Sequence, residues 1–185
     1  MKLVIGLSGR NGSGKGTVAK YLKENYGAVD RRFSNILSDI LKRLHKPPER
    51  VYLQQMGAVL REQFGADILV QVMEKDLESA KSPVILIDGV RYPNETEMLR
   101  KFENSILFFI EATPKIRYER MKARGEKAGE EHMRFEDFME AEEHETEKYL
   151  EDVKKLTDYQ IDNSGSFEEL YNQVTAALAE HGLTK

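Results

Sequence analysis

The fold is decided by the stretch Gly9-Arg10-Asn11-Gly12-Ser13-Gly14-Lys15-Gly16-Thr17, which lies between an apolar run at residues 3–7 and a helix-forming sequence at 18–22. Glycine adopts backbone torsions that a Cβ forbids, so several N–H groups of such a loop can point at one anion. The positive end of the following helix adds to that attraction. Lys15 is in register to reach the β- and γ-phosphates of a nucleoside triphosphate. Strand, glycine-rich turn and helix start together predict a nucleotide-binding loop, with every residue of the stretch a candidate contact for ATP.

Composition places the chain among single-domain globular proteins and excludes several kinds of chemistry. Its 185 residues fit one domain, 1–185, and are 40% hydrophobic and 32% charged. The absence of cysteine excludes disulfides, thiolate metal sites and a cysteine nucleophile. The chain has a net charge of −4 and so lacks the excess of basic residues that is common in nucleic-acid-binding proteins. We therefore expect no nucleic-acid partner.

The sequence also carries no sign of a membrane or an export signal. No apolar run approaches the roughly 20 residues that a membrane span needs. Met1-Lys2-Leu3 leads directly into the first expected strand, so we expect no signal peptide. These features predict a cytoplasmic protein without a membrane partner.

Helix and strand signals alternate along the chain. Two continuous apolar runs, at 84–87 and 106–110, are typical of central strands that are buried on both faces. Expected strands lie at 3–7, 28–33, 84–87, 106–110 and 159–161, and expected helices at about 15–25, 35–44, 49–64, 66–80, 114–124, 134–156 and 166–180. This alternation predicts an α/β fold, a three-layer sandwich in which a five-stranded parallel sheet is flanked by helices.

The end of the glycine-rich loop departs from the commonest form of this motif. Gly16 stands where Ser or Thr would supply a hydroxyl to Mg²⁺, and the hydroxyl arrives one residue later at Thr17. This Gly-Lys-Gly-Thr ending resembles adenylate kinase and the other nucleoside monophosphate kinases more than GTPases or motor ATPases. The resemblance implies the P-loop NTPase fold. It leaves three roles open for Thr17: a ligand of Mg²⁺, a contact to metal-bound water, or a contact to the α-phosphate.

An acidic residue, Asp88, follows the apolar run at 84–87 and precedes Gly89-Val90-Arg91. The carboxyl ends of strands in an open α/β sheet face the ligand crevice, on the side of the glycine-rich loop. Asp88 is there placed to hold Mg²⁺ through water and to contact the acceptor, and Arg91, a candidate catalytic residue, to grip a phosphate of the acceptor. The alternative is an ordinary strand-end turn with Asp88 as a helix cap. The run resembles the Asp-Gly-x-x-Arg of adenylate kinase with the arginine one position early, and residues 88–95 look closer to phage-type deoxynucleoside monophosphate kinases.

Three arginines, Arg117, Arg120 and Arg124, recur at spacings of three and four, which puts them on one face of a helix. Phosphoryl transfer needs preorganised cations, because negative charge spreads over the moving group. The spacing resembles the Arg-x-x-x-Arg at the lid edge of nucleoside monophosphate kinases, which implies catalytic roles for Arg120 and Arg124. The lid itself, at about 121–135, is too short for the zinc-binding or strand-bearing lids of long adenylate kinases. The alternative is a solvated face neutralised by neighbouring glutamates.

The last expected strand is followed by Asp162-Asn163-Ser164-Gly165-Ser166. Asn and Gly tolerate a positive φ and Ser166 can cap the next helix, so a simple turn explains the run. The same pattern resembles the end of dephospho-CoA kinases, which implies that Asn163 lies against the adenine of ATP. Both interpretations stay open on the sequence.

The segment at about 34–80 is the candidate acceptor-binding region. Ser34 and Arg43 fall where adenylate kinases carry Ser-Thr-Gly-Asp-x-x-Arg, a loose match for which a helix cap and a solvated face are the alternative. The run at 53–61 resembles the Leu-Gln-x-x-Gly-x-x-x-Arg stretch of the phage-type kinases. That resemblance implies that Arg61 contacts the phosphate or the base of the acceptor.

These resemblances identify the chain as a member of the P-loop nucleoside monophosphate kinase superfamily, with a core at about 1–33, 82–120 and 157–185. They imply that ATP·Mg²⁺ donates its γ-phosphoryl group to a small-molecule acceptor, a (deoxy)nucleoside monophosphate, on a monomer or simple homodimer. A phosphate acceptor is already anionic at neutral pH and needs no general base. A hydroxyl acceptor, as in dephospho-CoA kinase, would need a carboxylate, for which Asp30 and Asp39 are nearby. A third alternative is a nucleotide-switched regulatory ATPase.

Overall fold

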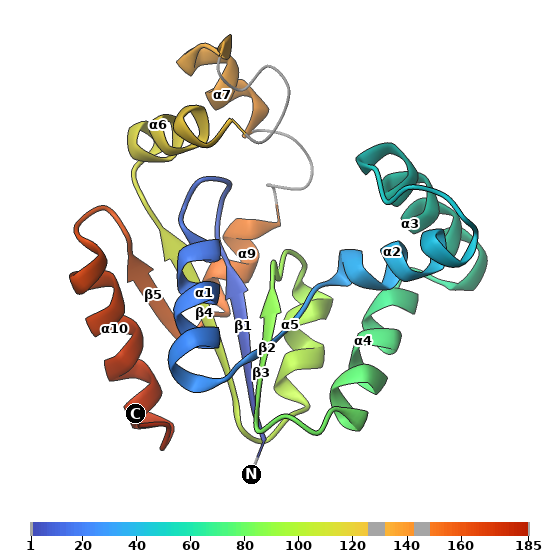
Figure 1. Cartoon of the computed structure of the whole chain (residues 1–185), viewed down its shortest axis with the longest axis horizontal. Coiled ribbons are helices and arrows are strands. Elements are labelled where there is room, and N and C mark those ends of the chain that lie inside the picture. Colours follow the sequence, from blue (N-terminus) through green and yellow to red (C-terminus); the bar gives the residue numbers. More distant parts are fainter. Residues whose placement is uncertain (1, 126–131, 143–148, 185) are drawn as a thin grey trace.

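The computed structural model describes residues 2–125, 132–142 and 149–184, and it is built around one parallel sheet (Figure 1). The strands are β1 (Leu3–Ser8), β2 (Val29–Arg31), β3 (Val84–Asp88), β4 (Ser105–Glu111) and β5 (Tyr159–Asp162). Their order across the sheet is β2-β3-β1-β4-β5, and every neighbouring pair is parallel. The prediction of a five-stranded parallel sheet is confirmed.

Helices cover both faces of the sheet. They are α1 (Lys15–Tyr26), α2 (Phe33–Arg43), α3 (Arg50–Phe64), α4 (Ile68–Ser79), α5 (Pro93–Arg100), α6 (Pro114–Arg124), α7 (Phe135–Ala141), α9 (Leu150–Lys155) and α10 (Phe167–Glu180). Side chains of α1 and α10 pack on one face, against Ile5 and Phe108. Side chains of α4, α5 and α9 pack on the other face, against Val4 and Ile85. None of the helices that the structure describes is both long and apolar enough to cross a membrane.

Strand β1 occupies the centre of the sheet because its sequence can be buried on both sides. Every residue from Leu3 to Ser8 is buried. At Gly6, an added Cβ would lie 2.8 Å from Cδ1 of Leu107 and 3.0 Å from Cδ2 of Leu99. A glycine here lets α5 approach the strand closely, and this packing holds the start of the glycine-rich loop in place.

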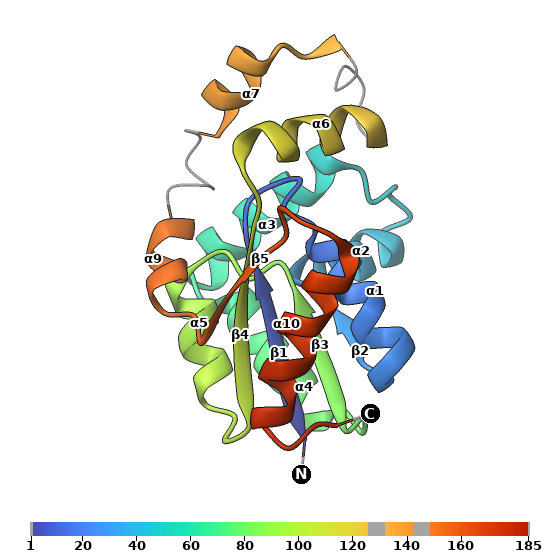
Figure 2. The ribbon, with the colours of Figure 1, turned by 90° about the vertical axis from the view of Figure 1, so that its left-hand side faces the viewer.

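The carboxyl ends of β1 and β3 lie side by side at one edge of the sheet, where Leu7 pairs with Asp88. The connection from β1 leads to β2, at one end of the sheet. The connection from β3 leads past β1 in the opposite direction, to β4. Open α/β sheets bind ligands in the crevice at such a reversal. Helices α6 and α7 lie above this edge (Figure 2).

Two expectations about helices differ from the structure. Residues 93–100 form α5, which the sequence pattern did not reveal. Proline stands at its first position, and the carboxylate of Glu95 accepts the backbone N–H of Tyr92 at its start. In the described part of the helix expected at 134–156, α7 ends at Ala141 and α9 begins at Leu150. Residues 143–148 between them, like residues 126–131 of the expected lid, lie outside the described residues.

Candidate active site

The glycine-rich loop connects β1 to α1 through a backbone that glycine alone adopts readily. The φ angle is +135° at Gly9, +75° at Gly12 and +100° at Gly14. A Cβ at Gly9 would clash with the carbonyl oxygen of Ile110, and one at Gly14 with Nδ2 of Asn163. The loop is therefore held tightly between β4 and the turn that follows β5.

Helix α1 begins directly after the loop, so its positive end faces the loop. Gly14 is the N-cap residue and has a left-handed conformation. Nζ of Lys15 donates hydrogen bonds to the carbonyl oxygens of Gly9, at 2.5 Å, and Arg10, at 2.9 Å. The ammonium group thus lies over the loop. A lysine beside a helix N-terminus attracts an anionic group such as a phosphate.

A cleft of ≈ 570 Å³ lies beside the loop at the carboxyl edge of the sheet. Its size is in the range of small-molecule sites. Residues predicted from distant parts of the sequence meet in its lining: Asn11, Gly12, Gly14, Lys15, Gly16, Thr17, Asp88, Arg91, Arg120, Arg124 and Asn163. Arg32, Met121 and Phe167, which the sequence did not single out, also line it. Among the described residues of this lining, Asp88 is the only carboxylate, so the charge of the cleft is dominated by basic side chains.

Asp88 at the end of β3 is paired with an arginine from the neighbouring strand end. Nη2 of Arg32 lies 2.6 Å from Oδ2 of Asp88, and Nε of Arg32 lies 3.4 Å from Oδ2 of Asp30. Arg32 is the N-cap of α2, directly after β2, and β2 pairs with β3. The sequence places Arg32 directly after an expected strand. Its proximity to Asp88 could not be predicted, because it depends on the pairing of β2 with β3.

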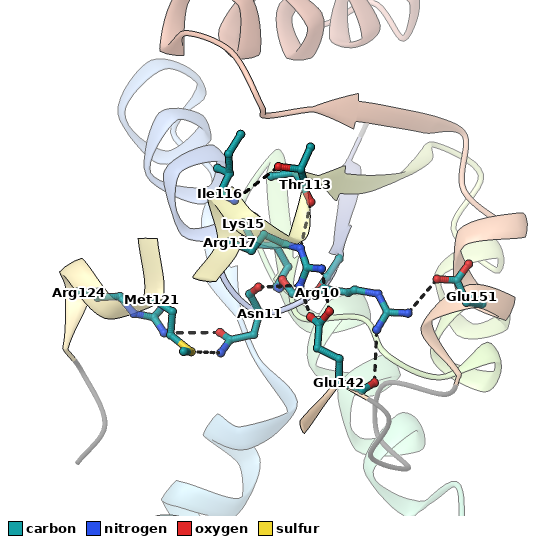
Figure 3. Close-up of polar contacts among 12 residues, drawn as sticks. Arg10, Asn11, Lys15, Thr113, Ile116, Arg117, Met121, Arg124, Glu142 and Glu151 are labelled. Atoms are coloured by element: carbon teal, nitrogen blue, oxygen red, sulfur yellow. Dashed lines mark hydrogen bonds and ion pairs between the residues drawn. The ribbon is translucent and has the colours of Figure 1, made fainter. Parts of the chain in front are cut away.

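The three arginines of α6 differ in their surroundings, and Arg117 is the one that does not line the cleft. Arg117 is 4% exposed and makes a two-bond ion pair with Glu142, in which Nη2 lies 2.8 Å from Oε2. Its Nε donates to the carbonyl oxygen of Ala112 at 3.0 Å, and its Nη1 to that of Asn11 at 3.4 Å (Figure 3). The guanidinium therefore connects the end of β4, the glycine-rich loop and the end of α7. These contacts occupy it, so it does not share the cationic face expected from the spacing.

Arg120 and Arg124 line the cleft instead. Nη2 of Arg124 lies 3.5 Å from Oδ1 of Asn11 in the loop. Nη1 of Arg120 is buried and has no hydrogen-bond partner among the described residues. A buried guanidinium nitrogen without an acceptor is costly, so this position favours an anionic or carbonyl oxygen from a ligand.

Two predicted nucleotide contacts also serve the internal structure. The side chain of Arg10 extends toward α9, where Nη2 lies 3.0 Å from Oε1 of Glu151 (Figure 3). Asn163 is 1% exposed, and its Nδ2 donates to the carbonyl oxygen of Ser13 at 2.7 Å. Asn163 thus supports the loop from behind while it lines the cleft.

The predicted acceptor contacts Ser34, Arg43 and Arg61 do not line this cleft. Ser34 and Arg43 are exposed near the two ends of α2. Arg61, on α3, lines a second pocket of ≈ 360 Å³. Because Arg91 lines the cleft and Tyr92 lines the second pocket, the two hollows are neighbours.

The fold and the site together define a P-loop nucleotide-binding protein with a kinase-like fold. A glycine-rich loop follows the central strand of a parallel sheet, and a basic cleft lies at the carboxyl edge. A family model described as an AAA domain matches residues 5–150.

Relatives align over nearly the whole chain. The UPF0200 protein of Methanothermobacter thermautotrophicus is 28% identical over 184 residues, covering 97% of this chain and 93% of the relative. The UPF0200 protein of Staphylothermus marinus is 32% identical over 180 residues, covering 92% of this chain and 89% of the relative. The chain therefore belongs to the AAA-domain family and, with these relatives, to the UPF0200 proteins.

Solved structures share the fold at low sequence identity. A shikimate kinase from Bacteroides thetaiotaomicron has a TM-score of 0.63 and 14% identity, over 98% of this chain and 99% of that one. The protein TT1252 from Thermus thermophilus has a TM-score of 0.62 and 18% identity, over 97% of each chain. These likenesses confirm the P-loop kinase-like fold.

Proposed function

We propose that this protein transfers the γ-phosphoryl group of ATP, bound with Mg²⁺, to a (deoxy)nucleoside monophosphate. The proposal is carried by the convergence of basic side chains on one cleft: Lys15, Arg32, Arg91, Arg120 and Arg124. Enzymes catalyse phosphoryl transfer by positioning the reactants and by neutralising charge on the moving group. A cleft lined in this way supplies both requirements.

The donor nucleotide is proposed to lie along the glycine-rich loop and the turn after β5. Lys15 then reaches the β- and γ-phosphates, and Arg120 offers its buried nitrogen to a phosphate oxygen. Phe167 lines the same cleft while remaining 62% exposed, and it stacks on Tyr171 with ring centroids 6.2 Å apart. Its ring offers a flat apolar surface to the base of the nucleotide.

The lining fits a magnesium ion held mainly by phosphates and water. Asp88 supplies one carboxylate and Thr17 one hydroxyl. The part of the chain that the structure describes has no group of three or more His, Cys, Asp or Glu residues arranged for a metal. Mg²⁺ in nucleotide sites keeps several waters and takes one or two carboxylates plus the substrate phosphates. When bound, the ion would neutralise charge on the transferred group.

The phosphate of the acceptor is proposed to lie near Arg91 and Arg32, on the β3 side of the cleft. A phosphate oxygen is already anionic and needs cations rather than a general base. Oδ2 of Asp88 is held by Arg32 at 2.6 Å, so this oxygen is already engaged and is not free to accept a substrate hydroxyl. This pairing favours a monophosphate acceptor over the hydroxyl of dephospho-CoA.

A coupled ADP-release assay over a panel of nucleoside monophosphates, with dephospho-CoA as a further acceptor, tests the proposal. We expect at least one monophosphate to be phosphorylated and dephospho-CoA to be left unchanged. Phosphorylation of dephospho-CoA alone would assign hydroxyl chemistry to the cleft. ATP hydrolysis that no acceptor accelerates would favour a nucleotide-switched regulatory ATPase.

A further inference from the structure

The second pocket contains groups that the proposed transfer does not use. Its volume is ≈ 360 Å³, and its described lining is Arg61, Ala66, Leu69, Val70, Tyr92, Asn94, Glu95 and Tyr149. Largely apolar walls with a few convergent polar groups are typical of a small-molecule site.

Two tyrosines give this pocket flat walls. The rings of Tyr92 and Tyr149 lie with centroids 5.5 Å apart and planes inclined by 53°. They come from the N-cap positions of α5 and α9, and Leu69 and Val70 of α4 add aliphatic surface. Planar bases pack against surfaces of this kind by stacking and by apolar contact.

Among the described residues that line the pocket, Glu95 is the carboxylate, and it is 6% exposed. Its Oε2 accepts the backbone N–H groups of Arg91, at 2.6 Å, and Tyr92, at 3.3 Å. Both bonds use the same oxygen, so Oε1 is the oxygen left for a ligand. Burial raises the pKa of Glu95 to about 7, against the lowering effect of these two bonds and of the guanidinium groups of Arg91 and Arg61. A buried carboxyl in this condition gains from a further hydrogen-bond donor.

The first turn of α5 joins the pocket to the phosphate cleft. Arg91 lines the cleft, and the next residue, Tyr92, lines the pocket. The side chain of Asn94 donates to Oδ1 of Asp67 at 2.6 Å, which fixes α5 against the start of α4. Consecutive residues of one turn thus line the two hollows, so an acceptor that spans this turn would have its phosphate near Arg91 and its base near Glu95.

We propose that the second pocket holds the base of the acceptor and that Glu95 selects bases that carry an amino group over bases that carry a carbonyl at the same position. This inference rests on the proposed transfer to a nucleoside monophosphate. Cytosine presents an amino group where uracil presents a carbonyl oxygen, and adenine differs from hypoxanthine in the same way. The amino group donates to the ionised carboxylate, which repels a carbonyl oxygen. Because burial raises the pKa of Glu95 to about 7, this preference is expected at a pH above that value, where the carboxylate predominates. Leaving a buried polar group unpaired costs more than losing an apolar contact, so the discrimination is expected to be substantial.

Calorimetry with a non-hydrolysable ATP analogue present tests the proposal without phosphoryl transfer. The probes are two pairs that differ at one amino group, CMP with UMP and AMP with IMP, in ribo and deoxyribo forms. We expect the amino member of at least one pair to bind about tenfold tighter or more. Glu95→Gln keeps an acceptor for the two backbone N–H groups, and we expect it to reduce that preference to less than about threefold. Glu97→Gln, on the exposed side of the same helix, is the matched control and should keep the preference.

A second variant tests the pocket independently of Glu95. Ala66 is exposed and lines the pocket, so Ala66→Phe fills the hollow without entering the core. We expect it to weaken monophosphate binding about tenfold or more and to leave the affinity for the ATP analogue unchanged. Ala58→Phe, at an exposed position of α3 outside both hollows, is the control.

Two results would overturn the proposal: equal affinity of the wild-type protein for both members of each pair, or wild-type binding by the Ala66→Phe variant. Because binding is measured without turnover, the pocket and the transfer can fail separately. A protein that binds monophosphates with this preference but phosphorylates none would contradict the proposed function and keep the assignment of the pocket. If wild type and both variants phosphorylate CMP and UMP with equal efficiency, the proposed function holds and the assignment of the pocket is wrong.

Discussion

Lys15 lies over the glycine-rich loop, where its ammonium donates to the carbonyl oxygens of Gly9 and Arg10. From this place it can neutralise charge on the transferring phosphates, and preorganised electrostatics is usually the largest catalytic contribution. Lys15→Ala is therefore expected to lower kcat/KM by about 10³-fold or more with the circular dichroism spectrum unchanged. Lys20→Ala, an exposed position on the same helix, is the control for steady-state kinetics. A Lys15→Ala enzyme that keeps more than about a tenth of wild-type turnover would remove the loop from catalysis.

Arg91 marks the acceptor side of the same cleft, since the next residue already lines the second pocket. Arg91→Ala is expected to raise the KM for the acceptor and to lower kcat, because the guanidinium would contact the acceptor phosphate. ATP affinity should stay nearly unchanged, as measured by calorimetry in the absence of acceptor. An equal loss of ATP affinity would instead place Arg91 in the donor site.

Glu95 is expected to make the stability of the protein depend on pH. Its pKa is raised from 4.5 to about 7, mainly by burial. The folded state therefore holds this proton more tightly than the unfolded state, and the resulting stabilisation is complete below pH 4.5 and lost as the pH rises through about 7. The loss at full ionisation is about 3 kcal/mol. Urea denaturation should show that Glu95→Gln removes this fall in the free energy of unfolding, whereas Glu97→Gln keeps it. Equal pH slopes in wild type and Glu95→Gln would mean that burial does not shift this carboxyl.

At the scale of elements, α6 and α7 are joined by a buried ion pair between Arg117 and Glu142. Removing one partner leaves an uncompensated buried charge, so Glu142→Ala should lower the free energy of unfolding by about 3 kcal/mol. Asp137→Ala, which breaks an exposed pair with Arg134, should change it little. Chemical denaturation of each variant checks both expectations. The double variant Arg117→Met/Glu142→Leu should recover most of the loss, and strictly additive effects would show that the two side chains are not coupled.

Elements with a local signal could be predicted from the sequence, and features that depend on tertiary proximity could not. A few consecutive residues are enough to predict the buried strands β3 and β4, from their apolar runs, and the glycine-rich loop, from its motif. The sequence prediction lacks helix α5 because residues 88–95 match a site motif, although Pro93 is a helix-start signal. Arg32 reaches Asp88 only because β2 pairs with β3. The second pocket forms only where α4 packs against α5. Helical spacing placed Arg117 with Arg120 and Arg124, but the packing of α6 on the loop separates it from them.

At the scale of the whole molecule, the arginines of the cleft come from two groups of elements. Helices α6 and α7 form one of them, because the hydroxyl of Tyr118 donates to the carbonyl oxygen of Met133 at 2.7 Å and its ring packs on Phe135 and Phe138. This unit lies above the carboxyl edge of the sheet and carries Arg120 and Arg124 (Figure 2). Arg32 and Arg91 instead belong to the strand ends of the sheet. Like charges that face one cleft repel each other until phosphates lie between them, so substrate binding should hold α6 and α7 more firmly over the sheet edge.

Binding of both substrates should therefore reduce the motion of α6 and α7. Closure would also exclude water, which otherwise competes for the γ-phosphoryl group. Hydrogen exchange in α6 and α7 is expected to slow markedly with a bisubstrate analogue and only slightly with ATP alone. Arg124→Ala should cut turnover about a hundredfold or more and remove most of that protection, whereas Lys115→Ala, exposed on the same helix, should do neither. If exchange does not respond to double occupancy and the Arg124→Ala enzyme works almost as well as wild type, Arg124 has no part in the transfer and the closure of α6 and α7 is wrong.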